Sequence, residues 1–245
     1  MNDWLETPVV SSTDKNYYTH YMPDDNGNEV VSSGRNWSFY WSASDQVSLW
    51  VAYPLYGKWA ESNVSRKDAY APDPFIDDAK QPATGGYSGN YSRGHQIPSA
   101  DRLGSRAINN SVFYMTNMTP QDQTFNGGLW AQLETQVRTW ADASDEFYVV
   151  TGCVVKGSTK TTSSNGLTVT VPAKYYKALL RKKGSTYTAC AYIYDHFTSQ
   201  TKFSESDRIS VDRLEELTGI DFFPNLIGIV GEATAANIEK TATAF

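Results

Sequence analysis

Three linked blocks between residues 91 and 140 decide the fold of this chain: YSRGHQIPSADR (91–102), FYMTNMTPQDQTFN (113–126) and GLWAQLETQVRTW (128–140). The third block predicts a helix from about Phe125 to Ala141, because its apolar residues recur every three or four positions and so form one buried face. These residues are Trp130, Leu133, Val137, Trp140 and Ala141. Upstream, SVFYMTN (111–117) is strand-like, and Thr119 with Pro120 fits a helix start.

The first block contains the side chain best suited to acid–base chemistry. His95 is one of three histidines in the chain, and a histidine can take a proton from water near neutral pH. Gly94 has no Cβ, so we expect Arg93 and His95 to project from a tight turn toward one target. A lone RGH motif is a weak signal, and a histidine satisfied by a backbone carbonyl is the commoner case.

Asn126 and Glu134 could complete a metal site. Asn126, Trp130 and Glu134 are spaced at intervals of four, which drifts by about 40° per step around a helix, so Asn126 and Glu134 share a broad stripe. An asparagine oxygen suits Mg²⁺, which keeps several waters and needs few protein ligands, and Glu134 could hold one of those waters. Spacing alone favours the alternative in which Asn126 is a helix N-cap and Glu134 is solvated.

In order and separation, the blocks SRGHQIPSADR, TNMTPQ and FNGGLWAQLE resemble the signature of the DNA/RNA non-specific endonuclease family. These are the sugar-non-specific nucleases of the ββα-metal (His-Me finger) superfamily. The resemblance implies an α+β fold, with a central antiparallel β-sheet flanked by helices and a ββα-metal motif. It also implies a metal-dependent endonuclease that hydrolyses DNA and RNA, with contacts to phosphates rather than base edges and hence little sequence preference.

The resemblance implies roles for individual residues as well. His95 would be the general base, and Asn126 the protein ligand of Mg²⁺, with Mn²⁺ or Ca²⁺ as alternative ions. Glu134 would organise the water shell of the metal, and Asn117 would orient the site. Arg93 would contact the phosphate.

The same resemblance to the family signature points to a second arginine and shows one departure from the signature. SRKDAYAPDPFI (65–76) resembles the family's arginine-bearing segment and points to Arg66 as the second arginine that contacts the phosphate or stabilises the transition state. Ser92 stands where the family has an aspartate. A carboxylate there would pair with arginine or fix the loop, whereas serine offers a neutral hydroxyl, so a slow or altered enzyme is an open alternative.

Composition indicates a folded protein with an acidic net charge. The chain has 245 residues, of which 40% are hydrophobic and 20% charged, and we expect one domain over 1–245 with a family-like core at about 30–227 and peripheral termini. The net charge of −6 argues against broad attraction to nucleic acid. A local positive patch would offset it, and its candidates are Arg66, Lys67, Arg93, Arg102 and Arg106.

Cysteine usage and the chain start bear on the cellular compartment. Cys153 and Cys190 lack zinc-site spacing and are either buried free thiols or a disulfide between neighbouring strands. No apolar run has membrane-spanning length, and MNDWLETPVV (1–10) lacks a signal-peptide core. The resemblance suggests an exported enzyme, so we expect a secreted or periplasmic form with its signal removed. Oligomeric state and an inhibitor protein stay open.

The remaining segments predict the scaffold. NWSFYWSASDQVSLWVAYPLY (36–56) reads as a hairpin around SASDQ, and core strands are expected at EFYVVTGCVV (146–155), YYKALLRK (175–182) and TYTACAYIY (186–194), with a turn at SSNG (163–166). SVDRLEELTG (210–219) predicts a helix capped by Ser210 and stopped by Gly219, with Val211, Leu214 and Leu217 facing inward. The tail from about Gly228 has no strong pattern.

Two other functions are consistent with parts of the sequence. Ser92 would fit a non-catalytic nucleic-acid-binding relative with a decayed site. The 16 tyrosines and 7 tryptophans would fit a carbohydrate-binding β domain, although we expect the core to take most of them. Neither alternative explains the ordered set of Arg93, His95 and Asn126.

Overall fold

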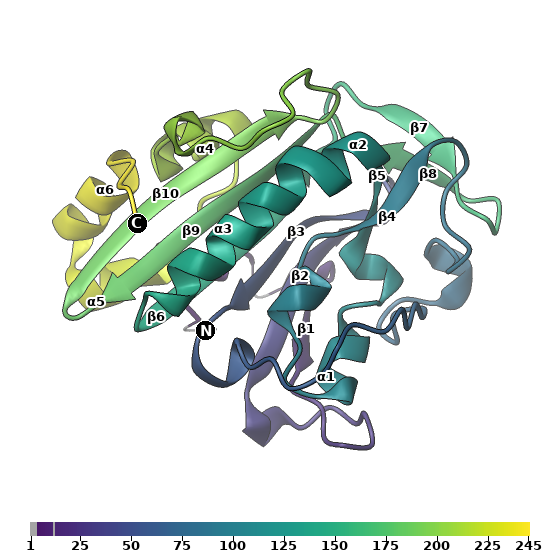
Figure 1. Cartoon of the computed structure of the whole chain (residues 1–245), viewed down its shortest axis with the longest axis horizontal. Coiled ribbons are helices and arrows are strands. Elements are labelled where there is room, and N and C mark those ends of the chain that lie inside the picture. The colour runs from purple at the N-terminus through teal and green to yellow at the C-terminus, as the bar shows by residue number, and fades with distance from the viewer. Residues whose placement is uncertain (1–3, 12) are drawn as a thin grey trace.

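The centre of the protein is a six-stranded antiparallel sheet, seen in a computed structural model that describes residues 4–11 and 13–245 (Figure 1). The strand order is β1-β2-β3-β6-β9-β10. The strands are β1 (Tyr17–Tyr21), β2 (Arg35–Ser42), β3 (Val47–Pro54), β6 (Glu146–Val154), β9 (Lys174–Lys183) and β10 (Thr186–Asp195). The predicted hairpin and core strands are therefore confirmed, while β1 was not predicted.

Helices flank the sheet, and two small ribbons lie beside it (Figure 1). The helices are α1 (Arg106–Ser111), α2 (Gln123–Phe125), α3 (Ala131–Asp142), α4 (Val211–Thr218), α5 (Ile227–Val230) and α6 (Glu232–Lys240). The ribbons pair β4 (Tyr91–His95) with β5 (Met118–Asp122), and β7 (Thr159–Thr162) with β8 (Thr168–Val171) around the predicted SSNG turn. The predicted α+β architecture is confirmed.

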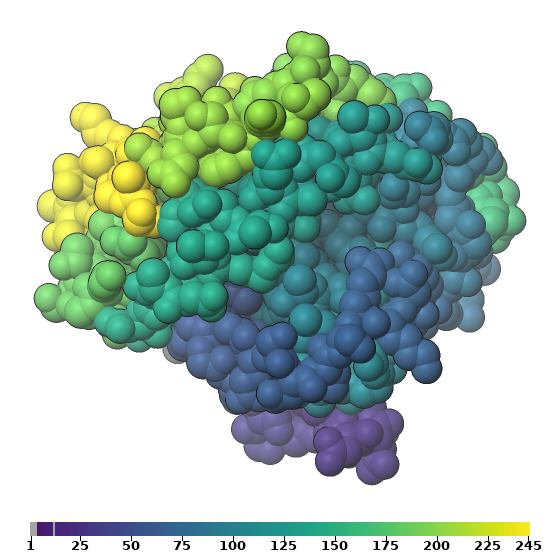
Figure 2. All heavy atoms as spheres, viewed as in Figure 1, coloured from purple at the N-terminus to yellow at the C-terminus, as the bar shows by residue number. Residues whose placement is uncertain are grey.

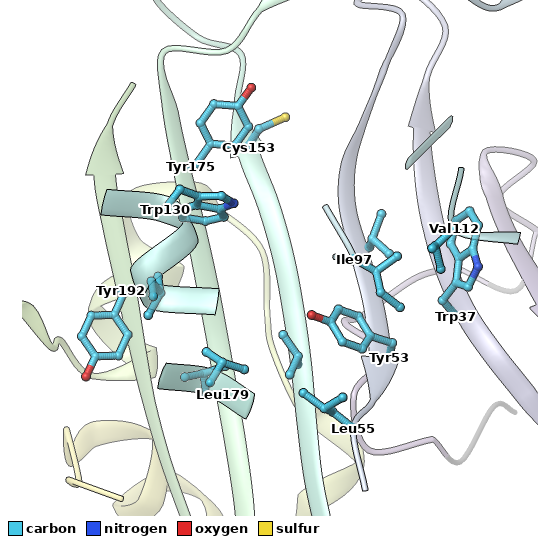
Figure 3. Packing of buried hydrophobic residues seen from close by; sticks show 14 of the residues in the cluster. Trp37, Tyr53, Leu55, Ile97, Val112, Trp130, Cys153, Tyr175, Leu179 and Tyr192 are labelled. Carbon is cyan, nitrogen blue, oxygen red and sulfur yellow. The ribbon is translucent and has the colours of Figure 1, made fainter. Parts of the chain in front are cut away.

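Each face of the sheet has its own apolar cluster, because successive side chains of a strand point to opposite faces. One cluster joins Val149 and Leu179 of the sheet to Leu133 and Val137 of α3. Figure 3 shows part of this cluster, with Trp130 packed near Tyr175 and Cys153. The other cluster joins sheet residues such as Val150, Ala178 and Leu180 to the following residues of α4, α6 and the segment between them: Val211, Leu214, Phe222, Leu226 and Ala235.

The β4–β5 ribbon continues into α2 and α3, which gives the ββα arrangement. The predicted helix start at Thr119 and Pro120 is wrong, because both residues lie in β5, where Pro120 pairs with Arg93. The missing proline N–H is tolerated in a two-stranded ribbon. The strand prediction for SVFYMTN (111–117) is also wrong, since this segment ends α1 and then forms a 3-10 turn at Met115–Asn117.

The site helix begins at Gln123, two residues earlier than predicted, and is not regular. Asp122 caps it, because its Oδ1 accepts hydrogen bonds from the backbone N–H groups of Thr124 and Phe125 at 2.9 and 3.0 Å. Asn126 is therefore not the N-cap. A π-helical turn covers Asn126–Trp130, with Gly128 at φ −106° and ψ −109°. Such turns occur often at functional sites, and this one breaks the even step of four on which the predicted stripe depends.

The C-terminal region partly follows its prediction. Ser210 caps α4, and Gly219 ends it in the left-handed conformation at φ 73°, as expected. Leu217, however, is 42% exposed rather than inward-facing. The patternless tail forms α5 and α6. Within the described part of the chain, no helix combines the length and the apolar character that a membrane crossing requires.

The two cysteines are buried free thiols. Cys153 lies on β6 and Cys190 on β10, and β9 separates these strands, so the alternative of a disulfide between neighbouring strands is wrong. Most of the tryptophans are core residues as expected, since Trp37, Trp41, Trp50, Trp130 and Trp140 are all buried. These five tryptophans are therefore not exposed as stacking platforms for a carbohydrate.

Candidate active site

A cleft of about 470 Å³ gathers the predicted residues on one side of the ββα unit. In Figure 2 the surface is hollowed between the teal helix α3 and the blue segments around residues 60–100. The cleft is lined by Arg66, Tyr70, Gly85, Gly86, Tyr87, Tyr91, Ser92, Arg93, His95, Pro98, Ser99, Ala100, Asn126, Glu134 and Arg138. Of the predicted site residues, only Asn117 lies outside this lining.

Strand β4 directs Arg93 and His95 to the same side, because they are two residues apart on an extended backbone. The predicted tight turn is wrong. Gly94 is needed for another reason: a Cβ there would lie 2.1 Å from Oε1 of Gln121 on the paired strand β5. The glycine thus allows the two strands to approach closely while both neighbours reach the cleft.

His95 is nearly buried, with 8% of its surface exposed, and its ring packs edge-on against Phe113 at 4.7 Å between centroids. Its Nε2 is buried and has no hydrogen-bond partner among the residues that the structure describes. Burial, and then the positive charges of Arg66 and Arg93, lower the pKa of His95 to about 3. The imidazole is therefore neutral at physiological pH and free to accept a proton.

Three arginines bring positive charge to the cleft. The Arg93 guanidinium lies 3.5 Å from the centroid of the Tyr70 ring and donates a hydrogen bond to the Thr84 carbonyl. Arg66 is half exposed and bonds Asp68 through Nε at 2.8 Å. Arg138 was missed in the sequence, although it follows Glu134 by one helical turn and so shares its stripe.

Asn126 and Glu134 both line the cleft despite the irregular turn between them. Neither side chain makes a hydrogen bond or an ion pair within the described ranges 4–11 and 13–245. Burial raises the pKa of Glu134 from its ordinary value, and the positive charge of Lys177 is the largest influence in the opposite direction. The alternative of a fully solvated Glu134 is therefore wrong.

Asn117 lies behind the site rather than in it. Its side chain is completely buried, its Oδ1 accepts a hydrogen bond from the N–H of Ile97 at 2.9 Å, and its Nδ2 donates to the carbonyls of Ile97 and Val112. These bonds fix the chain two residues after His95. The prediction that Asn117 orients the site fits this geometry.

Three members of the predicted basic patch lie outside the cleft lining: Lys67, Arg102 and Arg106. Arg102 is fully buried, where its guanidinium donates to Asn36 Oδ1 and to the carbonyls of Asn36, Pro54 and Trp59, so it is structural. Arg106 lines a separate cavity on the other side of the segment that carries Tyr70. The sequence could not show which arginines the fold buries.

The donor set in the cleft suits a hard cation. An amide oxygen and a carboxylate are ligands that Mg²⁺ and Ca²⁺ accept, and Mg²⁺ needs few of them because it retains several waters. Across the described residues, no cluster of three or more His, Cys, Asp or Glu could hold a metal ion. A transition-metal site built from imidazoles and thiolates is therefore not supported there.

A buried imidazole, an amide, a carboxylate and three guanidiniums line one cleft beside a ββα unit, and this set can bind a phosphate group with a base next to it. A family model described as DNA/RNA non-specific endonuclease matches residues 14–227. The chain belongs to this family.

Named relatives and one solved structure agree with the assignment. A nuclease of Nostoc sp. is 33% identical over 194 residues, covering 75% of this chain and 69% of its own length. A nuclease of Serratia marcescens is 29% identical over 193 residues, covering 76% and 71%. Human mitochondrial nuclease EXOG is 26% identical over 207 residues, covering 78% and 56%. The crystal structure of the EndoG/EndoGI complex shares the fold, with a TM-score of 0.65, 21% identity and coverage of 77% and 83%.

Proposed function

We propose that this nuclease is a metal-dependent endonuclease that hydrolyses phosphodiester bonds of both DNA and RNA, with His95 as its general base. One observation supports the proposal most: His95, Asn126, Glu134 and the arginines line a single cleft of about 470 Å³. A phosphodiester group bound there can contact the base and the positive charges at the same time.

His95 takes the proton of the attacking water. Its lowered pKa keeps it deprotonated, but so weak a base would accept a proton poorly. A bound phosphate changes this, because its negative charge offsets Arg66 and Arg93, two of the influences that lower the pKa. Substrate binding therefore makes His95 more basic at the moment when a base is needed.

The arginines hold and stabilise the phosphate. A planar guanidinium can contact two phosphate oxygens at once, and its charge matches the negative charge that develops during attack. Arg93 is held in place by the Tyr70 ring and the Thr84 carbonyl, whereas Arg66 is half exposed. We assign positioning to Arg93 and additional charge stabilisation to Arg66, with Asn117 fixing the backbone beneath them.

Asn126 would hold a Mg²⁺-type ion, and Glu134 would orient the water around it. Such an ion supplies positive charge to the phosphate and to the leaving oxygen. Both side chains are free of other hydrogen bonds in the described structure, which fits this use. All of these contacts are made to the phosphate, so we expect the proposed enzyme to have little sequence preference. An exported location stays part of the proposal.

Plasmid DNA and a structured RNA incubated with the protein across a panel of divalent cations, with an EDTA control, test the proposal. We expect metal-dependent cleavage of both substrates, and His95→Ala should lower kcat by about 10²- to 10⁴-fold. Thermal unfolding of the variant checks its fold. Native turnover by His95→Ala in Mg²⁺ would show that the base is assigned wrongly.

A further inference from the structure

A lysine that the mechanism above does not use is completely buried beneath the site helix. Lys177 is on β9 and is 0% exposed, and its Nζ donates a hydrogen bond of 2.6 Å to Oγ1 of Thr151, its partner on β6. The ammonium also lies 4.9 Å from the centroid of the Trp130 ring. Lysine is almost never fully buried unless its charge is compensated.

Glu134 follows Trp130 by four residues at the start of α3, so it lies on the same helix face as the ring that the Lys177 ammonium contacts. Asp101 is the other carboxylate whose charge acts on Lys177. Asp101 is already satisfied, because its Oδ1 accepts from Arg138 Nη1 at 3.0 Å and its Oδ2 accepts from the Tyr53 hydroxyl at 2.9 Å. Glu134 has no hydrogen bond or ion pair with the residues described. Lys177 and Glu134 are thus the cation and the anion that remain under the start of α3.

The electrostatic relation between the two groups is reciprocal. Burial lowers the pKa of Lys177, and Glu134 is the largest influence that opposes this shift. Burial raises the pKa of Glu134, and there Lys177 is the largest opposing influence. Each charge is therefore the main compensation for the burial of the other.

We propose that Lys177 is a positioning residue for the nuclease reaction. Its positive charge compensates Glu134 without a direct contact, so the Glu134 carboxylate is free to face the cleft. The proposal rests on the role assigned to Glu134 above. A contact ion pair would engage the carboxylate oxygens, whereas no Lys177–Glu134 ion pair forms within 4 Å, and the lysine donates to Thr151 instead. The charge acts from within the sheet, and the oxygens of Glu134 stay available to water.

Lys177→Met tests the charge with little change of shape, and Lys182→Met is its matched control. Lys182 is on the same strand and pairs with Glu146 at 2.5 Å, away from the cleft. We expect Lys177→Met to lower kcat by about tenfold with KM nearly unchanged, and Lys182→Met to retain kcat within twofold. A kcat within twofold of wild type for Lys177→Met would overturn the proposal.

A double-mutant cycle with Glu134→Gln separates a counter-charge from ordinary packing. Lys177→Met leaves the half-buried Glu134 carboxylate uncompensated, so its Tm should fall, and adding Glu134→Gln should restore part of that loss. In the Glu134→Gln background, Lys177→Met should cause no further loss of kcat. Additive effects on both Tm and kcat would mean that Lys177 does not act through Glu134.

The Tm measurements remain informative even if the proposed catalytic roles are wrong. Should Lys177→Met not fold, recovery of folding in Lys177→Met/Glu134→Gln supports the pairing, and continued failure to fold contradicts it. Wild-type protein without divalent-dependent cleavage would refute the proposed function. The non-additive Tm values would still report the Lys177–Glu134 pairing in that case.

Discussion

The two faces of the central sheet are packed for different purposes. Against α3, buried polar and charged groups such as Asp101, Lys177 and His95 interrupt the apolar cluster. Against α4 and α6, the contacts join aliphatic and aromatic residues, such as Ala178 of the sheet and Leu214. Burying polar groups costs stability unless each is compensated, so the difference indicates that the α3 face is specialised for chemistry and the opposite face for stability.

The largest expected effect on activity comes from the α3 face. Asn126→Ala should lower kcat/KM by about 100-fold or more, because it removes the proposed protein ligand of the metal. Its Tm should hardly change, since the amide has no hydrogen bond within the described structure. Cleavage rates across a Mg²⁺ titration measure the loss, with Asn165→Ala, an exposed asparagine, as control. Unchanged activity would remove Asn126 from the site.

The opposite face should show the reverse pattern. Leu214→Ala removes a fully buried side chain from the α4 contact and should lower the free energy of unfolding by about 2–4 kcal/mol. We expect kcat to stay within twofold at temperatures where the variant is folded. Leu217→Ala, at an exposed position of the same helix, is the control and should cost much less. Urea unfolding and initial rates check both, and a large loss of kcat in folded Leu214→Ala would break the distinction between the faces.

A pH-dependent effect of intermediate size is expected at His20, another buried group on the α3 face. Burial alone would lower its pKa, but hydrogen bonds and charge from Asp73 and Glu29 outweigh burial, so the pKa is raised above 6.5. Its stabilising contribution is therefore complete below pH 6.5 and is lost as the pH rises through the raised value.

His20→Gln should abolish that part of the alkaline loss of stability. Urea unfolding of wild type and variant between pH 6 and pH 9 would measure the two slopes. The variant has no imidazole to titrate, so its stability should fall less steeply over this range. Parallel slopes for the two proteins would mean that His20 does not carry a raised pKa.

The smallest expected effect is at Ser92, which lines the cleft beside Arg93. Ser92→Asp restores a carboxylate that can pair with arginine, and an ion pair at a partly exposed position contributes little, so we expect a two- to fivefold rise in kcat/KM. Ser92→Asn adds similar volume without charge and serves as control. A fall in activity for Ser92→Asp alone would mean that serine is the better residue in this cleft.

The sequence predicted the parts of the fold that depend on local pattern. Alternating apolar residues placed β6, β9 and β10, and the cap and stop of α4 followed from Ser210 and Gly219. For the site, the blocks around His95 and Asn126 predicted residues that do line one cleft. These features can be predicted because hydrophobic periodicity and helix capping depend on short segments of sequence.

The missed features depend on tertiary contacts. Pro120 suits a helix start as well as a two-stranded ribbon, and only the pairing with Arg93 decides between them. The π-helical turn after Asn126 has no periodic signal. Arg102 and Arg138 differ in exposure because one packs under the loops and the other faces the cleft, and a single sequence does not contain that difference.

One crystallographic measurement would test the shared phosphate site most directly. Crystals of His95→Ala soaked with Mn²⁺ and a short DNA duplex would locate the ion by anomalous scattering. We expect the peak beside the side-chain oxygen of Asn126, with a phosphate between the ion and residue 95. A peak elsewhere, or a phosphate that does not approach both positions, would contradict the proposed mechanism.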